Sequence, residues 1–292
     1  MADRVPAYDN HFHMSPSGRN IDALKEFEAA GGTGITLVTL PYAEVPIRDA
    51  SDFADSFEIT FRLAERAREE TSLEVNVAVG PYPIILLGLA EAYGLDRAEE
   101  IMIGGMEIAA RAVEEGRAVA MGEIGRPHFP VPAEIWDASN RVLERGFELA
   151  REAGCPAIIH CESDADTMSS LGAIADSARL PREMVIKHHC DPLVTDEETK
   201  GLMPSIPASK SLLKEALPKG DRFMIETDYI DDPSKPAMMM PPATVPKKVA
   251  AWVAQGVPEE TIFRINRDIP ERYYNRRNPA GRLASCSNGH VN

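Results

Sequence analysis

The sequence predicts an α/β protein built as a single (β/α)8 barrel. Three observations support this fold class. Eight short β-rich runs alternate with longer helical segments along the chain. Several of the runs, such as ITLVTL and VNVAV, are continuously apolar, which is typical of parallel strands buried on both faces. The alternative fold, an open doubly wound sheet, lacks support because the chain has no glycine-rich nucleotide-binding motif of the Rossmann or P-loop type.

The strands are predicted where apolar and β-branched residues gather in short runs. The run near Gly201–Ile206 is the weakest of the eight. In chain order, the predicted strands are Pro6–His13, Gly34–Leu40, Glu74–Gly80, Ala118–Ile124, Ala157–His160, Met184–His189, Gly201–Ile206 and Arg222–Asp228.

Helices are predicted between these strands, where apolar residues recur at helical spacing. Glycines mark two of the helix ends, at Gly31-Gly32 and at Gly154. The predicted helices are Ile21–Ala30, Phe53–Glu70, Arg97–Glu115, Ala133–Ala153, Asp164–Ala178, Ser209–Leu217 and Val245–Gln255.

The composition is that of a globular protein with a large core. The chain has 292 residues, of which 44% are hydrophobic. That length could hold two domains, but α/β barrels of this size occur as one. We therefore expect one barrel domain over residues 1–275, followed by a polar C-terminal tail over residues 276–292 that we expect to be frayed.

Composition also bears on location and on partners. No apolar run is long enough to span a membrane, and the start MADRVPAYDNH has no apolar core of a signal peptide. The four cysteines show no C-x-x-C spacing, which fits a reducing compartment. We therefore expect a cytoplasmic protein without a membrane partner. The formal net charge of -15 disfavours general nucleic-acid binding.

Metal-ligand residue types fall at the carboxyl ends of several predicted strands, where the active sites of such barrels lie. The stretch YDNHFHM places two imidazoles at i and i+2, which point to the same face of a strand. In total, four imidazoles and two carboxylates suit zinc or similar divalent ions. Six ligands are too many for one tetrahedral ion with an open position, so they predict two ions that share a bridging carboxylate and activate a water. The six candidates are His11, His13, Glu123, His160, one of His188 and His189, and Asp228.

The order H-x-H, GEIG, IIHC, HC and ETD resembles the amidohydrolase superfamily, and within it the TatD-related metal-dependent hydrolases. The resemblance runs from about Tyr8 to Tyr274. It implies a TIM barrel with a two-metal site, in which one carboxylate bridges the ions and another orients the attacking water and takes its proton. By that resemblance, His11, His13 and Asp228 would hold one ion, His160 and the strand-six histidine would hold the other, Glu123 would bridge, and Asp228 would be the base.

The strand-six ligand has to be chosen between two adjacent histidines. Neighbours on a strand face opposite ways, so only one of them can point into the barrel. We expect His189, which the resemblance favours because it directly precedes Cys190. With His189 inward, Lys187 would also point inward and could pair with Glu226 beneath the metals. With His188 inward, Lys187 would face the apolar helix layer without an obvious partner, which is costly.

The sequence departs from the family pattern on the substrate side of the site. Family members commonly carry an arginine two residues after the strand-five histidine, where this chain has Glu162. An acid there works against binding an anionic phosphodiester. After GEIG the chain reads Arg126-Pro127-His128, and Arg126 could restore a cation from another loop. We take Arg126, His128 and Glu162 as candidate substrate contacts, although His128 is better explained as an exposed loop residue.

Taken together, the sequence predicts a hydrolase that uses a water activated by two metal ions per chain, with zinc or manganese expected and magnesium as a further candidate. Its substrate would be a phosphodiester, as in a deoxyribonuclease acting on nucleic-acid fragments, or a small amide or lactone. The alternative is a barrel that has lost catalysis and serves as a binding or scaffold protein. Retention of Asp228, the candidate base, favours the enzyme. The oligomeric state is not indicated.

Overall fold

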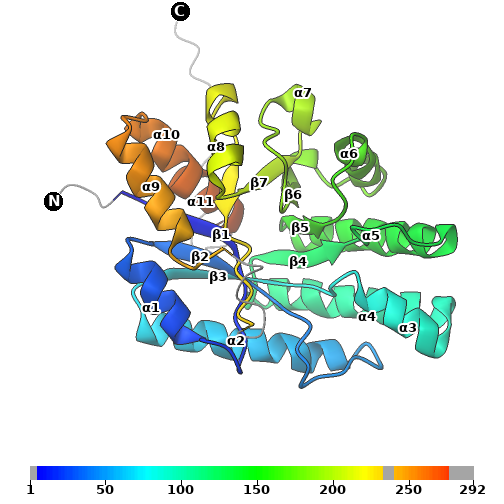
Figure 1. Ribbon diagram of the computed structural model, residues 1–292. Coiled ribbons are helices and arrows are strands. Elements are labelled where there is room, and N and C mark those ends of the chain that lie inside the picture. The colour runs from blue at the N-terminus through cyan, green and yellow to red at the C-terminus, as the bar shows by residue number, and fades with distance from the viewer. Residues whose placement is uncertain (1–4, 233–239, 276–292) are drawn as a thin grey trace, which may run out of the picture.

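The computed structural model describes residues 5–232 and 240–275. The expected tail, residues 276–292, lies outside the described part of the chain. Eight parallel strands follow one another in chain order to form a nearly closed barrel, with helices around it (Figure 1). The predicted fold class is confirmed. The strands are β1 (Tyr8–Phe12), β2 (Gly34–Val38), β3 (Glu74–Val79), β4 (Ala120–Gly125), β5 (Ala157–His160), β6 (Val185–Lys187), β7 (Met203–Pro207) and β8 (Met224–Glu226).

The barrel closes between its first and last strands at the carboxyl end. Phe12 at the end of β1 forms a parallel bridge with Tyr229, just past β8. The next backbone amide, that of His13, donates to the Tyr229 carbonyl oxygen at 2.8 Å. This closure brings the residues that follow β8 alongside those that follow β1.

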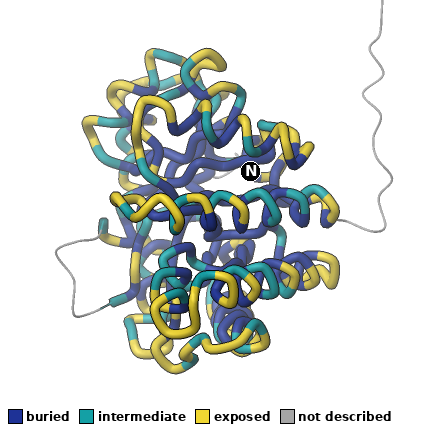
Figure 2. Tube along the Cα trace, turned by 90° about the vertical axis from the view of Figure 1, so that its right-hand side faces the viewer, coloured by how far each residue is buried: buried dark blue, intermediate teal, exposed yellow. Residues whose placement is uncertain are grey.

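The longer helices pack their apolar faces on the outside of the barrel, so the strands are buried on both sides (Figure 2). None of the described helices is long and apolar enough to cross a membrane. The helices are α1 (Ile21–Ala29), α2 (Asp52–Glu70), α3 (Ile85–Tyr93), α4 (Leu95–Glu114), α5 (Ala133–Ala153), α6 (Thr167–Ser177), α7 (Asp196–Thr199), α8 (Lys210–Ala216), α9 (Thr244–Ala254), α10 (Glu259–Phe263) and α11 (Ile269–Tyr274).

The interior of the barrel is filled by side chains at its amino-terminal end. Tyr273 and Tyr274 of α11 pack into the bottom of the barrel, and the Tyr274 ring lies 6.3 Å from that of Tyr8. Because this end is closed by apolar packing, polar chemistry is confined to the opposite end. One residue from each strand contributes to the packed interior: Tyr8, Val38, Ala78, Ala120, Ile158, Ile186, Met203 and Met224.

The described residues include four helices that were not predicted, α3, α7, α10 and α11, and strand β6 ends earlier than expected. Helix α3 was not expected, because its segment ILLGLAEAY is almost uniformly apolar at its start and has no helical alternation to read. Strand β6 ends at Lys187 rather than at His189, because the backbone leaves the extended conformation there and His189 takes a φ of 47°. The second difference determines which histidine enters the site.

Candidate metal centre

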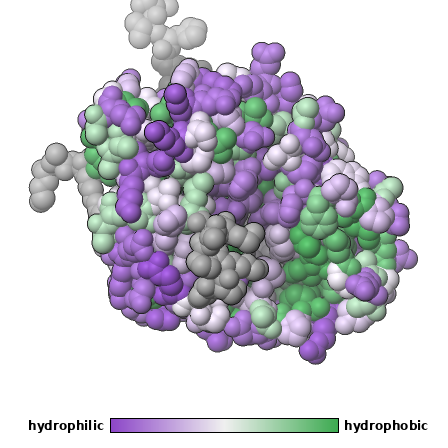
Figure 3. All heavy atoms as spheres, in the orientation of Figure 1, coloured by the Kyte–Doolittle hydropathy of each residue, from purple (hydrophilic) through white to green (hydrophobic). Residues whose placement is uncertain are grey.

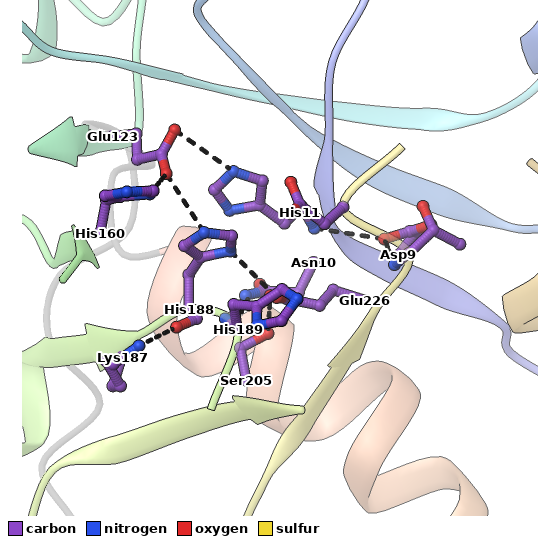
Figure 4. Close-up of polar contacts among 12 residues, drawn as sticks. Asp9, Asn10, His11, Glu123, His160, Lys187, His188, His189, Ser205 and Glu226 are labelled. Carbon is purple, nitrogen blue, oxygen red and sulfur yellow. Dashed lines mark hydrogen bonds and ion pairs between the residues drawn. The ribbon is translucent and has the colours of Figure 1, made fainter. Parts of the chain in front are cut away.

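Ligand-type side chains converge at the carboxyl end of the barrel, and Figure 4 labels His11, Glu123, His160 and His188 among them. Six of these side chains are the first candidates for ligands. They come from both sides of the mouth and are brought together only by closure of the barrel. Their order round the mouth follows the strands. His11 belongs to β1 and His13 follows it, Glu123 belongs to β4, His160 ends β5, His188 follows β6, and Asp228 lies two residues past β8.

The first group of ligand-type atoms comes from the ends of β1 and β8. The Nε2 atoms of His11 and His13 lie 3.1 Å apart, and His13 Nε2 lies 3.6 Å from Asp228 Oδ1. One ligand atom from each residue lies within 4.8 Å of the others. Two imidazole nitrogens and a carboxylate oxygen that face one another in this way form a donor set suited to a divalent ion.

The second group is centred on Glu123. Its Oε1 atom lies 2.6 Å from His160 Nδ1 and 3.1 Å from His188 Nε2. Its other oxygen, Oε2, lies 3.9 Å from His11 Nε2 in the first group. The two oxygens of one carboxylate therefore face the two groups. Burial works against ionisation of Glu123, but the imidazoles of His188 and His160 hold its pKa well below the usual value.

The surroundings of the His11 and His13 imidazoles suit a role as metal ligands. His13 Nδ1 lies 2.8 Å from the Val38 carbonyl oxygen on β2, which leaves Nε2 directed at the group. His11 is buried, and its Nδ1 atom has no hydrogen-bond partner among the described residues. Burial, together with repulsion from the neighbouring imidazoles, lowers the pKa of His11 to about 3. His11 is therefore neutral at physiological pH, as a metal ligand must be.

Close packing of β4 against β5 explains the glycines of GEIG. Gly125 has a φ of 143°, and a Cβ atom there would lie 1.9 Å from the His160 carbonyl oxygen. Only glycine fits at that position. The close approach lets Glu123 reach His160 across the two strands.

A buried polar network supports the centre from below. Glu226 at the end of β8 is fully buried and accepts hydrogen bonds from His188 Nδ1 at 3.0 Å and from the His189 backbone amide at 2.7 Å. Its other oxygen accepts a hydrogen bond from the Ser205 hydroxyl, which in turn accepts one from the Asn10 amide at 3.0 Å. Contacts of this kind fix the ring of a ligating histidine.

A second buried acid, Asp9 of β1, ties β1 to the end of β8. One of its oxygens accepts hydrogen bonds from the backbone amides of Thr227 at 2.9 Å and His11 at 3.2 Å. The other accepts one from the Thr227 hydroxyl at 2.7 Å. Burial raises the pKa of Asp9 to about 7. Since Thr227 precedes Asp228, Asp9 positions Asp228 relative to His11.

The structure differs from the expected choice on strand six. His188, not His189, points into the centre and contacts Glu123 (Figure 4). His189 is exposed and belongs to neither group of ligand-type residues. Strict alternation along a strand does not apply at this point, because β6 has already ended at Lys187.

The predicted pairing of Lys187 with Glu226 is also wrong. Lys187 is buried, and its ammonium group donates to the His188 carbonyl oxygen at 2.7 Å. Glu226 is instead occupied by the strand-six histidines and Ser205. From the sequence, Lys187 had no obvious partner if His188 pointed inward. In the structure its partner is a backbone carbonyl oxygen.

The three candidate substrate residues lie beside the centre, but two of them bind each other. Arg126 is 1% exposed and forms a two-point ion pair with Glu162, whose Oε2 atom lies 2.8 Å from Arg126 Nε. Although burial opposes it, the guanidinium lowers the pKa of Glu162. Arg126 also donates to Asn140 at 2.9 Å. His128 is exposed, and its Nδ1 atom lies 2.7 Å from His160 Nε2.

Sequence reasoning missed Asp9 as a supporting residue and considered Glu226 only as a partner of Lys187. Both are buried acids on strands of the barrel, next to candidate ligands in the sequence. An acid inside an apolar run adjacent to an H-x-H or T-D pair is the signal that could have found them.

A (β/α)8 barrel with histidines and carboxylates clustered at its carboxyl end is the arrangement of metal-dependent hydrolases related to the amidohydrolase superfamily. Comparison with known families then gives the particular group. Residues 8–275 match the family described as TatD related DNase, and the chain belongs to that family. The resemblance noted from the motifs is confirmed.

The chain is also similar to individual proteins. The chain is 32% identical over 275 residues to an uncharacterized protein of Methanocaldococcus jannaschii, covering 92% of this chain and 96% of that protein. A TatD homologue from Escherichia coli has a similar structure, with a TM-score of 0.64, 18% identity, and coverage of 94% of this chain and 99% of the other. An organophosphorus hydrolase from Deinococcus radiodurans gives a TM-score of 0.63, with 16% identity and coverage of 92% of each chain. At these identities, the two structures show a shared fold.

Proposed function

We propose that the protein is a hydrolase that works with two divalent ions per chain and attacks its substrate with water. The observation that carries the proposal is the placement of Glu123, whose two oxygens face two separate groups of ligand-type atoms. In this proposal His11, His13 and Asp228 would hold one ion, His160 and His188 would hold the other, and Glu123 would contribute to both.

The donor set fits divalent ions by its chemistry. Imidazoles and carboxylates in a largely buried cluster suit zinc, manganese and, through the carboxylates, magnesium. Among the described residues no group partners the Nδ1 atom of His11, while its Nε2 atom faces His13 and Glu123. When bound, the ions would supply a water of lowered pKa and neutralise charge that develops on the substrate.

The protein side chains supply the remaining steps. Asp228 is 26% exposed, so among the proposed ligands it is well placed to meet a substrate and a water at the mouth. Although burial acts in the opposite direction, the imidazoles of His188 and His13 hold its pKa well below the usual value. Asp228 is therefore ionised at neutral pH and can accept the proton of the attacking water. Glu226 and Val38 keep the rings of His188 and His13 in place.

The surroundings of the centre favour an uncharged carbonyl substrate, such as a lactone or an amide, over a phosphodiester. Recognition of a phosphate uses arginine or lysine groups that are free to bind it. Near this centre, Arg126 is neutralised by Glu162, and the Lys187 ammonium is buried against a backbone carbonyl. The net charge of -15 further opposes the approach of a polyanion.

Metal content tests the first part of the proposal. We expect about two divalent ions per chain after reconstitution with zinc or manganese and dialysis, because the six proposed ligands form two groups that meet at Glu123. Elemental analysis by mass spectrometry measures this ratio. A Glu123→Gln variant serves as the matched control and should hold fewer ions, since the amide bridges poorly. A wild-type ratio of one ion or fewer would contradict the two-metal proposal.

Turnover tests the second part. The metal-loaded protein should hydrolyse small lactones or amides faster than it cleaves single-stranded DNA, because Arg126 and Lys187, the described cations nearest the centre, are already engaged. A panel of lactones, amides, simple phosphodiesters and single-stranded DNA compares the kcat/KM values. Vigorous DNA cleavage without carbonyl hydrolysis would reverse the substrate assignment and leave the metal proposal intact.

The ion pair beside the centre makes a separate prediction about stability. Glu162→Arg, which would restore the arginine of the family pattern, should lower the free energy of unfolding by at least about 3–5 kcal/mol, because it leaves the buried Arg126 unpaired beside a second cation. Urea denaturation measures the loss. Ser163→Arg adds the same cation to the same loop without breaking the pair, and it should be close to wild type. Equal stability of the two variants would show that the Arg126–Glu162 pair is unimportant.

A further inference from the structure

We propose that an apolar groove at the carboxyl end of the barrel binds an uncharged acyl or aryl arm of the substrate. This inference rests on the proposed function, because it concerns the substrate of the same centre. The groove lies between helix α3 and the segment that follows β2, and it measures about 350 Å³.

None of the residues that line this groove carries a charge, although 26% of the chain is charged. The lining is partly open to solvent, and Tyr93 at its rim is 48% exposed. In the space-filling view, the region around α3 at the lower right forms a broad hydrophobic surface (Figure 3). Exposed apolar surface gathered in one place is a common mark of a binding site. The lining residues are Pro41, Tyr42, Val45, Pro46, Ile47, Ile84, Ile85, Gly88, Leu89, Ala92 and Tyr93.

The groove begins close to the candidate metal centre. The ring of Tyr82 lies 5.1 Å from the ring of His160, measured between centroids. Ile85, the first residue of α3, is only three residues further along the chain, which spans at most about 11 Å. A substrate whose reacting carbonyl lies beside His160 could therefore extend an arm of a few carbons along Tyr82 into the groove.

A second, smaller groove adjoins the first. It measures about 290 Å³ and shares Pro41 and Tyr42 with the first. Its lining also includes Ser15 and Ile230, which lie two residues past His13 and Asp228. Unlike the first, this second groove also carries acidic residues, Glu44, Asp231 and Asp232, so the apolar arm is assigned to the first groove alone.

The chemistry of the lining selects the class of arm. An anionic or strongly polar arm would lose water without gaining a partner there, whereas an alkyl or aryl arm would be favoured by burial. This is consistent with an uncharged carbonyl substrate at a centre where Arg126 is already neutralised.

A series of γ-lactones tests the proposal. We expect kcat/KM to rise from unsubstituted γ-butyrolactone through the methyl and propyl to the hexyl derivative, by up to roughly fourfold for each methylene that becomes fully buried. The rise should appear mainly in KM, because the arm binds equally in the ground state and the transition state.

Gly88→Trp fills the groove without disturbing the core. A Cβ atom at Gly88 meets nothing within 4 Å, and replacing a helical glycine does not weaken the helix. The variant should lose the dependence of kcat/KM on chain length, because the tryptophan ring occupies the space of the arm. Ala250→Trp, at an exposed position on α9, adds the same side chain elsewhere and should keep that dependence.

The outcomes separate this inference from the proposed function. Turnover without any chain-length dependence in the wild type would overturn the groove assignment and leave the hydrolase proposal standing. If no lactone is hydrolysed, calorimetric binding of the same series to the wild type and to Gly88→Trp tests the groove assignment independently of turnover. Equal affinities across the series would overturn that assignment. A dimer seen by light scattering that Gly88→Trp converts to a monomer would overturn it as well, because the groove would then bind a second copy of the chain.

Discussion

Replacing Asp228 with asparagine is expected to lower kcat by about 10²- to 10⁴-fold, the range associated with loss of a general base. Asp228 Oδ1 lies 3.6 Å from His13 Nε2, at the exposed edge of the first ligand group. The asparagine amide keeps one oxygen that can contact a metal ion, but it cannot accept a proton. Most of the bound metal should therefore remain, while turnover is lost.

The measurement combines kcat at saturating metal with elemental analysis of the same sample. Asp191→Asn serves as the matched control, since it removes an exposed carboxylate from the loop after β6 and should leave kcat unchanged. If Asp228→Asn turned over substrate at nearly the wild-type rate with its metal retained, another group would have to be the base.

The strands of the barrel could be predicted because their apolar runs are a local signal. Each run is buried on both faces, so a strand can be recognised from its own apolar residues without information about the neighbouring strands. The run VIKHHC was the exception. Its first residues form β6 as expected, but the turn at His189, with a φ of 47°, depends on contacts made by residues far away in the sequence.

The residues that support the centre could not be found in the same way, because their partners are distant. Asp9 and Thr227 are 218 residues apart, and Glu226 lies 38 residues after His188. Such contacts exist only once the barrel has closed. The ligand-type residues themselves could be predicted more readily. In a parallel barrel the carboxyl ends of all strands meet at one edge, so residues at those ends come together without any detailed packing information.

The pair formed by Arg126 and Glu162 shows the same limit for charged residues. In the sequence, each looked like a group that could face a substrate. In the structure they lie at the ends of neighbouring strands and neutralise each other. A charge beside an active site is available to a ligand only if the fold provides no closer partner.

Replacing His188 with alanine should remove about one of the two expected metal ions and lower kcat/KM by more than about 100-fold, beyond the range typical of residues that only support a ligand. His188 Nε2 lies 3.1 Å from Glu123 Oε1, and its Nδ1 atom is held by Glu226 at 3.0 Å. The ring is therefore fixed with Nε2 directed at the second ligand group. Its loss would leave only His160 and the bridging carboxylate for that ion.

His189→Ala is the matched control, because it deletes the same ring one residue later in the chain. The His189 side chain is exposed, and the contact it makes with Glu226 comes from its backbone amide, which alanine retains. Metal content and kcat/KM of this variant should stay close to wild type. If His189→Ala lost the metal and His188→Ala did not, His189 would be the ligand. The centre would then have to rearrange on binding metal, with His189 turning inward and Glu226 releasing His188.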